Sequence, residues 1–223
     1  MNSMEVLYED NHVIVCVKPF NILSQKDATG DADMLSLVKD YIKKKYDKKG
    51  NVYLGLVHRL DRPVGGVMVF ARTSKAAARL NDAIKKHLFS KKYLAVVHGI
   101  LQNDGMFTDY LLKDENGNTI VTNKEKGKYS ELSYKVLSVN KQKKLTLVEV
   151  DLVTGRHHQI RVQFASRGYP LYGDKRYGND LDKQISLWAY SLSFLHPITK
   201  EMKKFICFPP LNSDGFNYFN IKL

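Results

Sequence analysis

The sequence predicts an α+β fold in which a largely antiparallel mixed sheet is flanked by helices and loops. Strand-like apolar runs follow one another with short turns between them, and only three stretches have a helical apolar period. No internal repeat or flexible linker interrupts the 223 residues, so a single domain over 1–223 is the simplest organisation. A chain of this length can bury a core without disulfides or metals.

The elements predicted in the N-terminal part share apolar runs bounded by turn or capping residues. They are strands at 6–8 and 12–17, a helix at 34–46, a strand-rich stretch at 51–71 and a helix at 74–88. Asp33 and Ser74 are the predicted N-caps of the two helices. Leu88 is expected to end the apolar stripe of the second helix, which includes Ala77, Leu80 and Ile84.

The C-terminal part is predicted to be rich in strands, with one short helix. The strands are expected at 93–100, 106–113, 119–123, 129–139, 145–152, 188–195 and 203–208, and the helix at 156–167. Asn116 and Gly117 are a strong hairpin signal. In the helix, Ile160, Phe164 and Ala165 should face the core, and Arg156, Gln159 and Gln163 should share a polar face.

The charge balance favours a polyanionic partner. The chain has 35 Lys and Arg against 23 Asp and Glu, which gives a net charge of +12. Lysines gather in 39–49 and in 124–144. Nucleic acid is the commonest partner of such a surface, although a solvated, lysine-rich surface explains the same pattern.

Other features of the sequence favour the cytoplasm. The N-terminus lacks the apolar core of a secretion signal, and no apolar run approaches the roughly 20 residues of a membrane span. Cys16 and Cys207 lie in apolar runs and are expected to be buried, reduced thiols. No spacing of Cys and His suggests a zinc site.

A charged cluster interrupts the strand-rich stretch 55–71. His58, Arg59, Asp61 and Arg62 lie between two apolar runs, and a turn with a proline and two glycines follows. Flanking arginines should keep Asp61 ionised, and an ionised carboxylate beside a ligand can act as a nucleophile or a base. A salt-bridged loop between strands is an equally good interpretation.

Two later segments also combine charge with chemistry-bearing side chains. Tyr93 follows two lysines at the start of a strand, where it could stack on a base or serve as a half-buried strand residue. Arg156 lies at the junction of a strand and a helix, which favours anion binding. His157 and His158 are adjacent, so on a helix they would point apart and make a poor metal pair.

In this order and spacing, the segments resemble the RluA family of RNA pseudouridine synthases. The motifs that carry the resemblance are the opening VLYEDNHVIVCVKPFNIL, HRLD at 58–61, KKYLAVVHG at 91–99, TGRHHQIR at 154–161 and YGDKRYG at 172–178. HRLD alone would be a weak match, but the ordered set is specific and spans nearly the whole chain. The resemblance implies a pseudouridine-synthase-type catalytic domain without a separate N-terminal RNA-binding domain.

The resemblance implies an isomerase that detaches uracil from ribose in RNA, rotates it and rejoins it through C5. Asp61 would be the catalytic residue, and Arg156 would pair with it. Tyr93 would stack on the flipped base and could remove the C5 proton in the last step, and Arg59 would support the RNA backbone or fill the gap left by the flipped uridine. Arg62, Lys43, Lys44 and Lys45 are candidate RNA contacts. The substrate would be tRNA or ribosomal RNA, and neither a cofactor nor a metal is expected. No membrane or obligate protein partner is expected, and a monomer is the default. A catalytically silent RNA-binding module of the same fold is the alternative.

The sequence departs from the family pattern directly after HRLD. The family usually has two variable residues and then Thr-Ser-Gly, whereas this chain has Val64 and Gly65 before Gly66. Two hydroxyl groups are therefore missing near the catalytic loop. Gly66 keeps the family glycine, so altered local packing is expected rather than lost activity.

Overall fold

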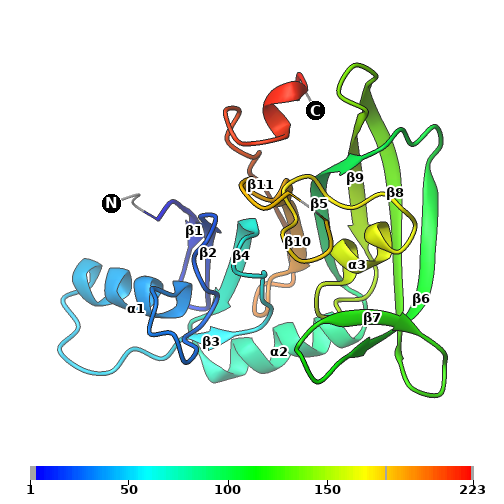
Figure 1. Cartoon of the computed structure of the whole chain (residues 1–223). Coiled ribbons are helices and arrows are strands. Elements are labelled where there is room, and N and C mark those ends of the chain that lie inside the picture. The colour runs from blue at the N-terminus through cyan, green and yellow to red at the C-terminus, as the bar shows by residue number, and fades with distance from the viewer. Residues whose placement is uncertain (1–3, 179, 222–223) are drawn as a thin grey trace. The chain divides into compact units, whose positions relative to one another are not determined.

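The computed structural model describes residues 4–178 and 180–221, which form two compact units (Figure 1). The first unit comprises Met1–Ser90 and Ala189–Phe208, and the second comprises Lys91–Trp188 and Pro209–Leu223. Each unit is described by itself. Both contain strands and helices, which confirms the predicted α+β class.

The first unit is built on a sheet whose neighbouring strands run in the order β1-β2-β4-β10. Its strands are β1 (Val6–Glu9), β2 (Val13–Lys18), β3 (Gly55–Leu56), β4 (Gly65–Ala71), most of β10 (Leu187–Leu195) and β11 (Met202–Ile206). β2 and β4 are antiparallel and buried along their whole length, which explains why both read as continuous apolar runs. Their register places Lys18, the last residue of β2, opposite Gly66.

Two helices belong to the first unit, α1 (Met34–Lys45) and α2 (Ser74–Lys85). The side chain of Asp33 accepts a hydrogen bond from the Ser36 amide, so the predicted cap of α1 is confirmed. The predicted cap of α2 is wrong by one residue. Thr73, in an extended backbone conformation, accepts from the Ala76 amide, and Ser74 is the first helical residue.

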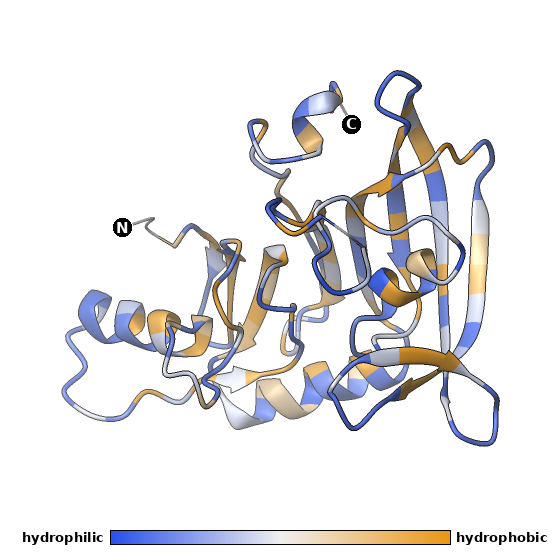
Figure 2. Ribbon diagram, viewed as in Figure 1, coloured by the Kyte–Doolittle hydropathy of each residue, from blue (hydrophilic) through white to orange (hydrophobic). Residues whose placement is uncertain are grey.

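α2 also ends earlier than the apolar stripe suggested. His87 has a left-handed φ of 56°, so the chain leaves the helix before Leu88, which is 50% exposed. Ala76 and Leu80 are the buried residues of α2, and they join a core made by one face of the β2–β4 pair and by Phe89, Leu192 and Phe194. Figure 2 shows the alternation of polar and apolar residues along both helices.

The second unit contains a five-stranded antiparallel arrangement in the order β5-β9-β8-β6-β7. The strands are β5 (Phe89–His98, of which the first two residues belong to the first unit), β6 (Gly105–Lys113), β7 (Thr119–Thr122), β8 (Lys128–Asn140) and β9 (Leu145–Leu152). The bounds predicted for β9 are confirmed. The predicted hairpin between β6 and β7 is confirmed as well, with Gly117 at a φ of 77°.

The helix α3 (Gln159–Ala165) covers part of this sheet. Its Phe164 packs against Phe107 of β6 and Tyr134 of β8, with ring centroids 4.9 and 5.3 Å apart. The helix is shorter than predicted because His158 has a left-handed φ of 51°, which leaves Arg156 in the preceding turn.

The predicted polar face of α3 is wrong for its two glutamines. Gln159 is 2% exposed and Gln163 is fully buried. Their amides are hydrogen-bonded inside the unit: Gln163 donates to Asp109 at 2.7 Å, and Gln159 is bonded within the turn that carries Arg156. Periodicity does not reveal these long-range partners, which satisfy both ends of the Gln159 amide and the Nε2 of Gln163.

The two cysteines are free, and only one matches its prediction. Cys16 is fully buried, whereas Cys207 is half-buried because it follows the end of β11. No helix in the described part of the chain is long and apolar enough to cross a membrane.

Candidate active site

Asp61 lies in the loop between β3 and β4 of the first unit and is partly buried. The loop backbone is fixed on both sides of this residue. The Ser24 hydroxyl donates to the Leu60 carbonyl at 2.7 Å and accepts from the Leu60 amide at 3.0 Å. The Val64 amide donates to the Asp61 carbonyl at 3.0 Å, which closes a tight turn.

Lys18 holds the other side of this turn. The side chain is fully buried, and its Nζ donates to the carbonyl oxygens of Arg62 at 3.0 Å and Val64 at 2.6 Å, and to that of Pro19 at 3.1 Å. Three acceptors arranged around one ammonium use all of its donors. Lys18 is a positioning residue that the sequence reasoning did not single out, although a lysine that ends a buried apolar strand was a usable signal.

The charge of Lys18 is coupled to the loop that carries Asp61. Burial lowers the pKa of Lys18 to about 7, the Asp61 carboxylate raises it and the Arg62 guanidinium lowers it. The attraction between Lys18 and Asp61 therefore partly offsets the cost of burying the ammonium. The loop thus combines a carboxylate with a buried cation that fixes its backbone.

Arg59 and Arg62, on either side of Asp61, are both exposed. Arg62 forms an ion pair with Asp31 at 2.8 Å, in which both side chains are nearly half exposed. Such a surface pair contributes little stability, about 0–1 kcal/mol, so an RNA phosphate can replace Asp31 at low cost. Both arginines are therefore available to a polyanion.

The turn after the motif explains the glycine at position 66. Gly66 has a φ of 126°, and a Cβ there would lie 2.3 Å from the carbonyl oxygen of Ala189. Only glycine fits this position without moving the backbone. Val64, one of the two departures from the family pattern, is buried at 2% exposure.

The second unit carries Tyr93 and Arg156. Tyr93 is buried on β5, opposite Val150 of β9. Arg156 is exposed in the turn that follows β9, and its Nε donates to the Tyr129 carbonyl at 2.9 Å. The two segments meet at Lys91, whose Nζ lies 3.0 Å from the position that a Cβ would take on Gly155.

Gln159 shapes the turn that carries Arg156. Its Oε1 accepts from the Arg156 amide at 3.0 Å and from the Thr154 hydroxyl at 2.8 Å, while its Nε2 donates to the Glu131 carbonyl at 3.1 Å. The turn is thereby tied to β8. Gln159 is a second positioning residue. The sequence pattern predicts that it faces solvent, so this role could not be recognised from the sequence.

A tyrosine of the YGDKRYG segment orients His158. The Tyr177 hydroxyl accepts from the Thr119 amide at 2.8 Å and lies 2.9 Å from Nδ1 of His158. The same hydroxyl therefore contacts both the β7 backbone and the imidazole, which holds the ring of His158 in place. The imidazole of His157 stacks on that of His158.

A buried ion pair joins α3 to the same segment. Arg161 Nε and NH2 donate to the two carboxylate oxygens of Asp174 at 2.8 and 2.7 Å, and the side chains are only 6% and 0% exposed. Burial alone raises the pKa of Asp174, but the hydrogen bond and charge of Arg161 lower it below its usual value. TGRHHQIR and YGDKRYG are therefore one structural block.

The candidate residues are distributed over both units. Asp61, Arg59 and Arg62 share the loop of the first unit, and the second unit holds Tyr93 and Arg156. The pairing of Arg156 with Asp61 stays a prediction. Among the described residues, no group of three His, Cys, Asp or Glu side chains is arranged to hold a metal ion.

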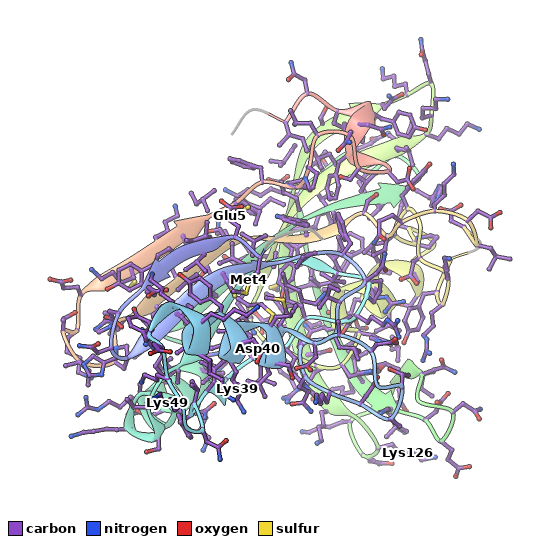
Figure 3. All side chains as sticks on the ribbon, turned by 90° about the vertical axis from the view of Figure 1, so that its left-hand side faces the viewer. Met4, Glu5, Lys39, Asp40, Lys49 and Lys126 are labelled. Atoms are coloured by element: carbon purple, nitrogen blue, oxygen red, sulfur yellow. The ribbon has the colours of Figure 1, made fainter. Side chains whose placement is uncertain are left out.

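The three lysines predicted to contact RNA form the last turn of α1 but differ in their surroundings. Lys43 and Lys44 are exposed, whereas Lys45 forms an ion pair with Glu9 at 2.8 Å and a hydrogen bond with Tyr41 at 3.0 Å. Figure 3 labels Lys39 and Lys49, which extend the same basic stretch. Lys43 and Lys44 are thus the stronger candidates.

Comparison with known proteins identifies the family. A model described as RNA pseudouridylate synthase matches residues 12–166. The chain is 33% identical over 204 residues to the uncharacterized RNA pseudouridine synthase YhcT of Bacillus subtilis, covering 90% of this chain and 67% of that protein. It is also 33% identical to the ribosomal large subunit pseudouridine synthase C of Buchnera aphidicola, over 96% of this chain and 69% of that protein.

A solved structure supports the fold. Human RNA pseudouridylate synthase domain containing 4 superimposes with a TM-score of 0.77 at 22% identity, over 96% of this chain and 90% of that one. The sequence matches and this fold confirm the resemblance noted from the motifs. The chain belongs to the RluA family of RNA pseudouridine synthases, which are isomerases.

Proposed function

We propose that this chain converts uridine to pseudouridine in large-subunit ribosomal RNA, with Asp61 as the catalytic carboxylate. The observation that carries the proposal is an intact Asp61 in a turn whose backbone is fixed by Lys18 and Ser24. Ribosomal RNA is preferred over tRNA because relatives with about a third of their residues identical are named for the ribosomal large subunit.

The reaction needs only groups that protein side chains provide. The C1′–N1 bond breaks, the uracil turns, a C1′–C5 bond forms, and the hydrogen of C5 is lost while N1 gains one. Asp61 attacks the ribose or removes a proton from it to start the sequence. Substrate and product are isomers, so the chemistry needs no redox cofactor, metal or energy source.

The target base must leave its helix before it can react. Base flipping costs roughly a few kcal/mol, which contacts to the RNA backbone have to offset. We assign Tyr93 to stacking on the flipped base, Arg156 to orienting the carboxylate, and Arg59 with Arg62 to supporting the RNA. The net charge of +12 is consistent with such contacts.

The substrate is tested by a chemical map of pseudouridine in total RNA from cells with and without the gene. Loss of one or a few pseudouridine sites in large-subunit ribosomal RNA supports the proposal. If the wild-type gene restores these sites and the Asp61→Asn gene does not, the reaction depends on the Asp61 carboxylate. Loss of sites confined to tRNA would overturn the choice of RNA. Loss of no site, together with no conversion of unmodified transcripts by purified protein, would favour the silent RNA-binding module.

Tyr93→Phe is expected to bind RNA normally while turnover falls. The substitution keeps the ring that stacks on the base and removes only the hydroxyl, which we assign to the final removal of the C5 proton. Loss of a general base typically costs 10²–10⁴-fold, so a fall of about 10²-fold in single-turnover rate is expected. A variant with wild-type rate would eliminate this role for the hydroxyl, and Tyr93→Leu tests the ring itself.

Neutralising Lys43 and Lys44 together is expected to lower the affinity for RNA. The slope of the logarithm of the binding constant against the logarithm of salt concentration should also become smaller. Each lost phosphate contact lowers the salt slope by about 0.7–0.9, so a fall of about 1.5 is expected for the Lys43→Gln/Lys44→Gln variant. Lys85→Gln/Lys86→Gln is the matched control, because these lysines are exposed at the end of α2 and carry the same charge. Equal slopes for both variants would mean that α1 does not contact RNA.

Three further predictions remain open. We propose that 1–223 acts as one catalytic domain, that the protein works as a monomer without an obligate protein partner, and that it acts in the cytoplasm. Sedimentation of the purified protein with and without RNA tests the oligomeric state.

A further inference from the structure

Lys91 occupies an unusual position in the second unit. It lies two residues before Tyr93 on β5, and its side chain is partly buried. Its Nζ lies 3.0 Å from the place of a Cβ on Gly155, so a side chain at residue 155 would push the ammonium away by a few tenths of an ångström. The ammonium is therefore held beside the turn that carries Arg156.

Lys91 differs from its neighbour in having no counter-ion. In the part of the chain that the structure describes, no carboxylate or hydrogen-bond acceptor contacts its Nζ. Lys92, on the opposite face of the strand, contacts Glu149 Oε1 at 3.0 Å. Burial lowers the pKa of Lys91, with no acidic group opposing the shift. A partly desolvated cation of this kind is stabilised by an anion from outside the protein.

Arg156 supplies a second cation at the same turn. Its Nε is used by the Tyr129 carbonyl, which fixes the guanidinium plane, and the described residues give its two terminal nitrogens no partner. Lys91 Nζ therefore lies against Gly155, the residue that precedes Arg156, and two cationic residues belong to this turn region.

We propose that Lys91 forms a phosphate subsite beside the Arg156 turn, which binds a phosphodiester next to the uridine that stacks on Tyr93. The inference rests on the proposed function, because it assigns Lys91 to the phosphodiester next to the target uridine. Lys91 and Tyr93 share one face of β5, about 7 Å apart along the strand. In a nucleotide the base and the phosphate are separated by one ribose, so the two side chains are suited to opposite ends of one nucleotide.

The first test compares Lys91→Met with Lys92→Met in binding to the pentanucleotide of uridine at several salt concentrations. Lys91→Met is expected to weaken binding roughly tenfold at low salt, as for a charged hydrogen bond, and to lower the salt slope by about 0.7. Lys92→Met should stay within twofold of wild type. Equal effects of the two variants, or an unchanged slope in Lys91→Met, would overturn the proposal.

Thermal unfolding separates this role from a structural one. Removing an unpaired, partly buried charge should leave the melting temperature of Lys91→Met unchanged or raise it, whereas a structural lysine would lower it on substitution. Gly155→Ala is a second probe, because its methyl group displaces the Nζ while both cations remain. It is expected to weaken binding in the same direction but by less.

The subsite is located by replacing the phosphodiesters of the pentanucleotide, one at a time, with neutral methylphosphonates. Wild type is expected to lose affinity at one linkage, and Lys91→Met should be insensitive there. If the variant loses as much as wild type at that linkage, Lys91 does not bind it. Because binding is read without turnover, a positive result would stand even if no pseudouridine formed, so failure of the subsite and failure of the proposed function are distinguishable.

Discussion

Asp61→Asn is expected to abolish pseudouridine formation while RNA binding stays within about threefold of wild type. Asparagine keeps the size and shape of the side chain but cannot attack the ribose or accept its proton. A fall of at least about 10³-fold in single-turnover rate follows from the loss of a nucleophile or base. The turn should remain, since the hydrogen bonds that close it use the backbone of Leu60, Asp61 and Val64.

The same variant has a measurable effect on Lys18. Burial lowers the pKa of Lys18 and the Asp61 carboxylate raises it, so the amide should lower this pKa further below about 7. Nuclear magnetic resonance of methylated lysines in wild type and variant measures the change. A downward shift would show that Lys18 remains buried against the turn, whereas a collapsed loop would expose Lys18 and raise its pKa, so the loss of turnover could not be attributed to collapse.

Asp82→Asn is the matched control for this experiment. Asp82 is an exposed carboxylate of α2, paired with Lys86 at 2.8 Å, and its change to an amide has the same effect on net charge. Wild-type turnover is expected. Comparable turnover in Asp61→Asn itself would contradict the assignment of the catalytic residue and leave the family membership without its expected chemistry.

Local sequence patterns predicted the elements but not the contacts that fix the catalytic loop. A capping aspartate before an amphipathic run located the start of α1, and the ordered apolar runs located β9 and the β6–β7 hairpin. The loop depends on Lys18, which reaches the Val64 carbonyl 46 residues away. The local spacing of apolar residues does not predict which backbone carbonyl a distant lysine will contact.

In the second unit, too, local patterns did not predict the long-range contacts of the two glutamines and of the turn at Gly155. Periodicity predicts a solvent-facing surface for Gln159 and Gln163, whereas both side chains are buried and donate hydrogen bonds to β8 and β6. The proximity of Lys91 to Gly155 follows from the pairing of β5 with β9, and register of this kind is set by tertiary structure. Positioning contacts of this kind were therefore not accessible to the local patterns that identified the elements.

Arg161→Met is expected to destabilise the protein by about 3–5 kcal/mol, the usual cost of breaking a buried ion pair from one side. The substitution leaves the Asp174 carboxylate, which is fully buried, without its cation. Asp174 also accepts from the amides of Arg176 and Tyr177, so its displacement should loosen the segment that orients His158. Urea unfolding of wild type and variant measures the loss.

The dependence of this loss on pH identifies its cause. In wild type, the pKa of Asp174 is lower in the folded state than in the unfolded state. The ion pair therefore contributes its full stability at pH values above the unfolded-state pKa. This stability is lost as the pH falls through the folded-state pKa. Without Arg161, the burial that raises this pKa is opposed only by the amides of Arg176 and Tyr177, so a proton on Asp174 becomes more favourable in the folded state. The variant should therefore differ most from wild type near neutral pH and approach it in acid.

Two variants complete the argument. Arg161→Met/Asp174→Leu removes both charges and should be less destabilised than the sum of the single changes, because neither partner is left buried alone. Lys86→Met breaks the exposed pair with Asp82 and should cost no more than about 0.5 kcal/mol. If Arg161→Met were as mild as Lys86→Met at neutral pH, the ion pair would not be what holds TGRHHQIR to YGDKRYG, and the orientation of the Arg156 turn would have to depend on the hydrogen bonds of Gln159 and Tyr177 instead.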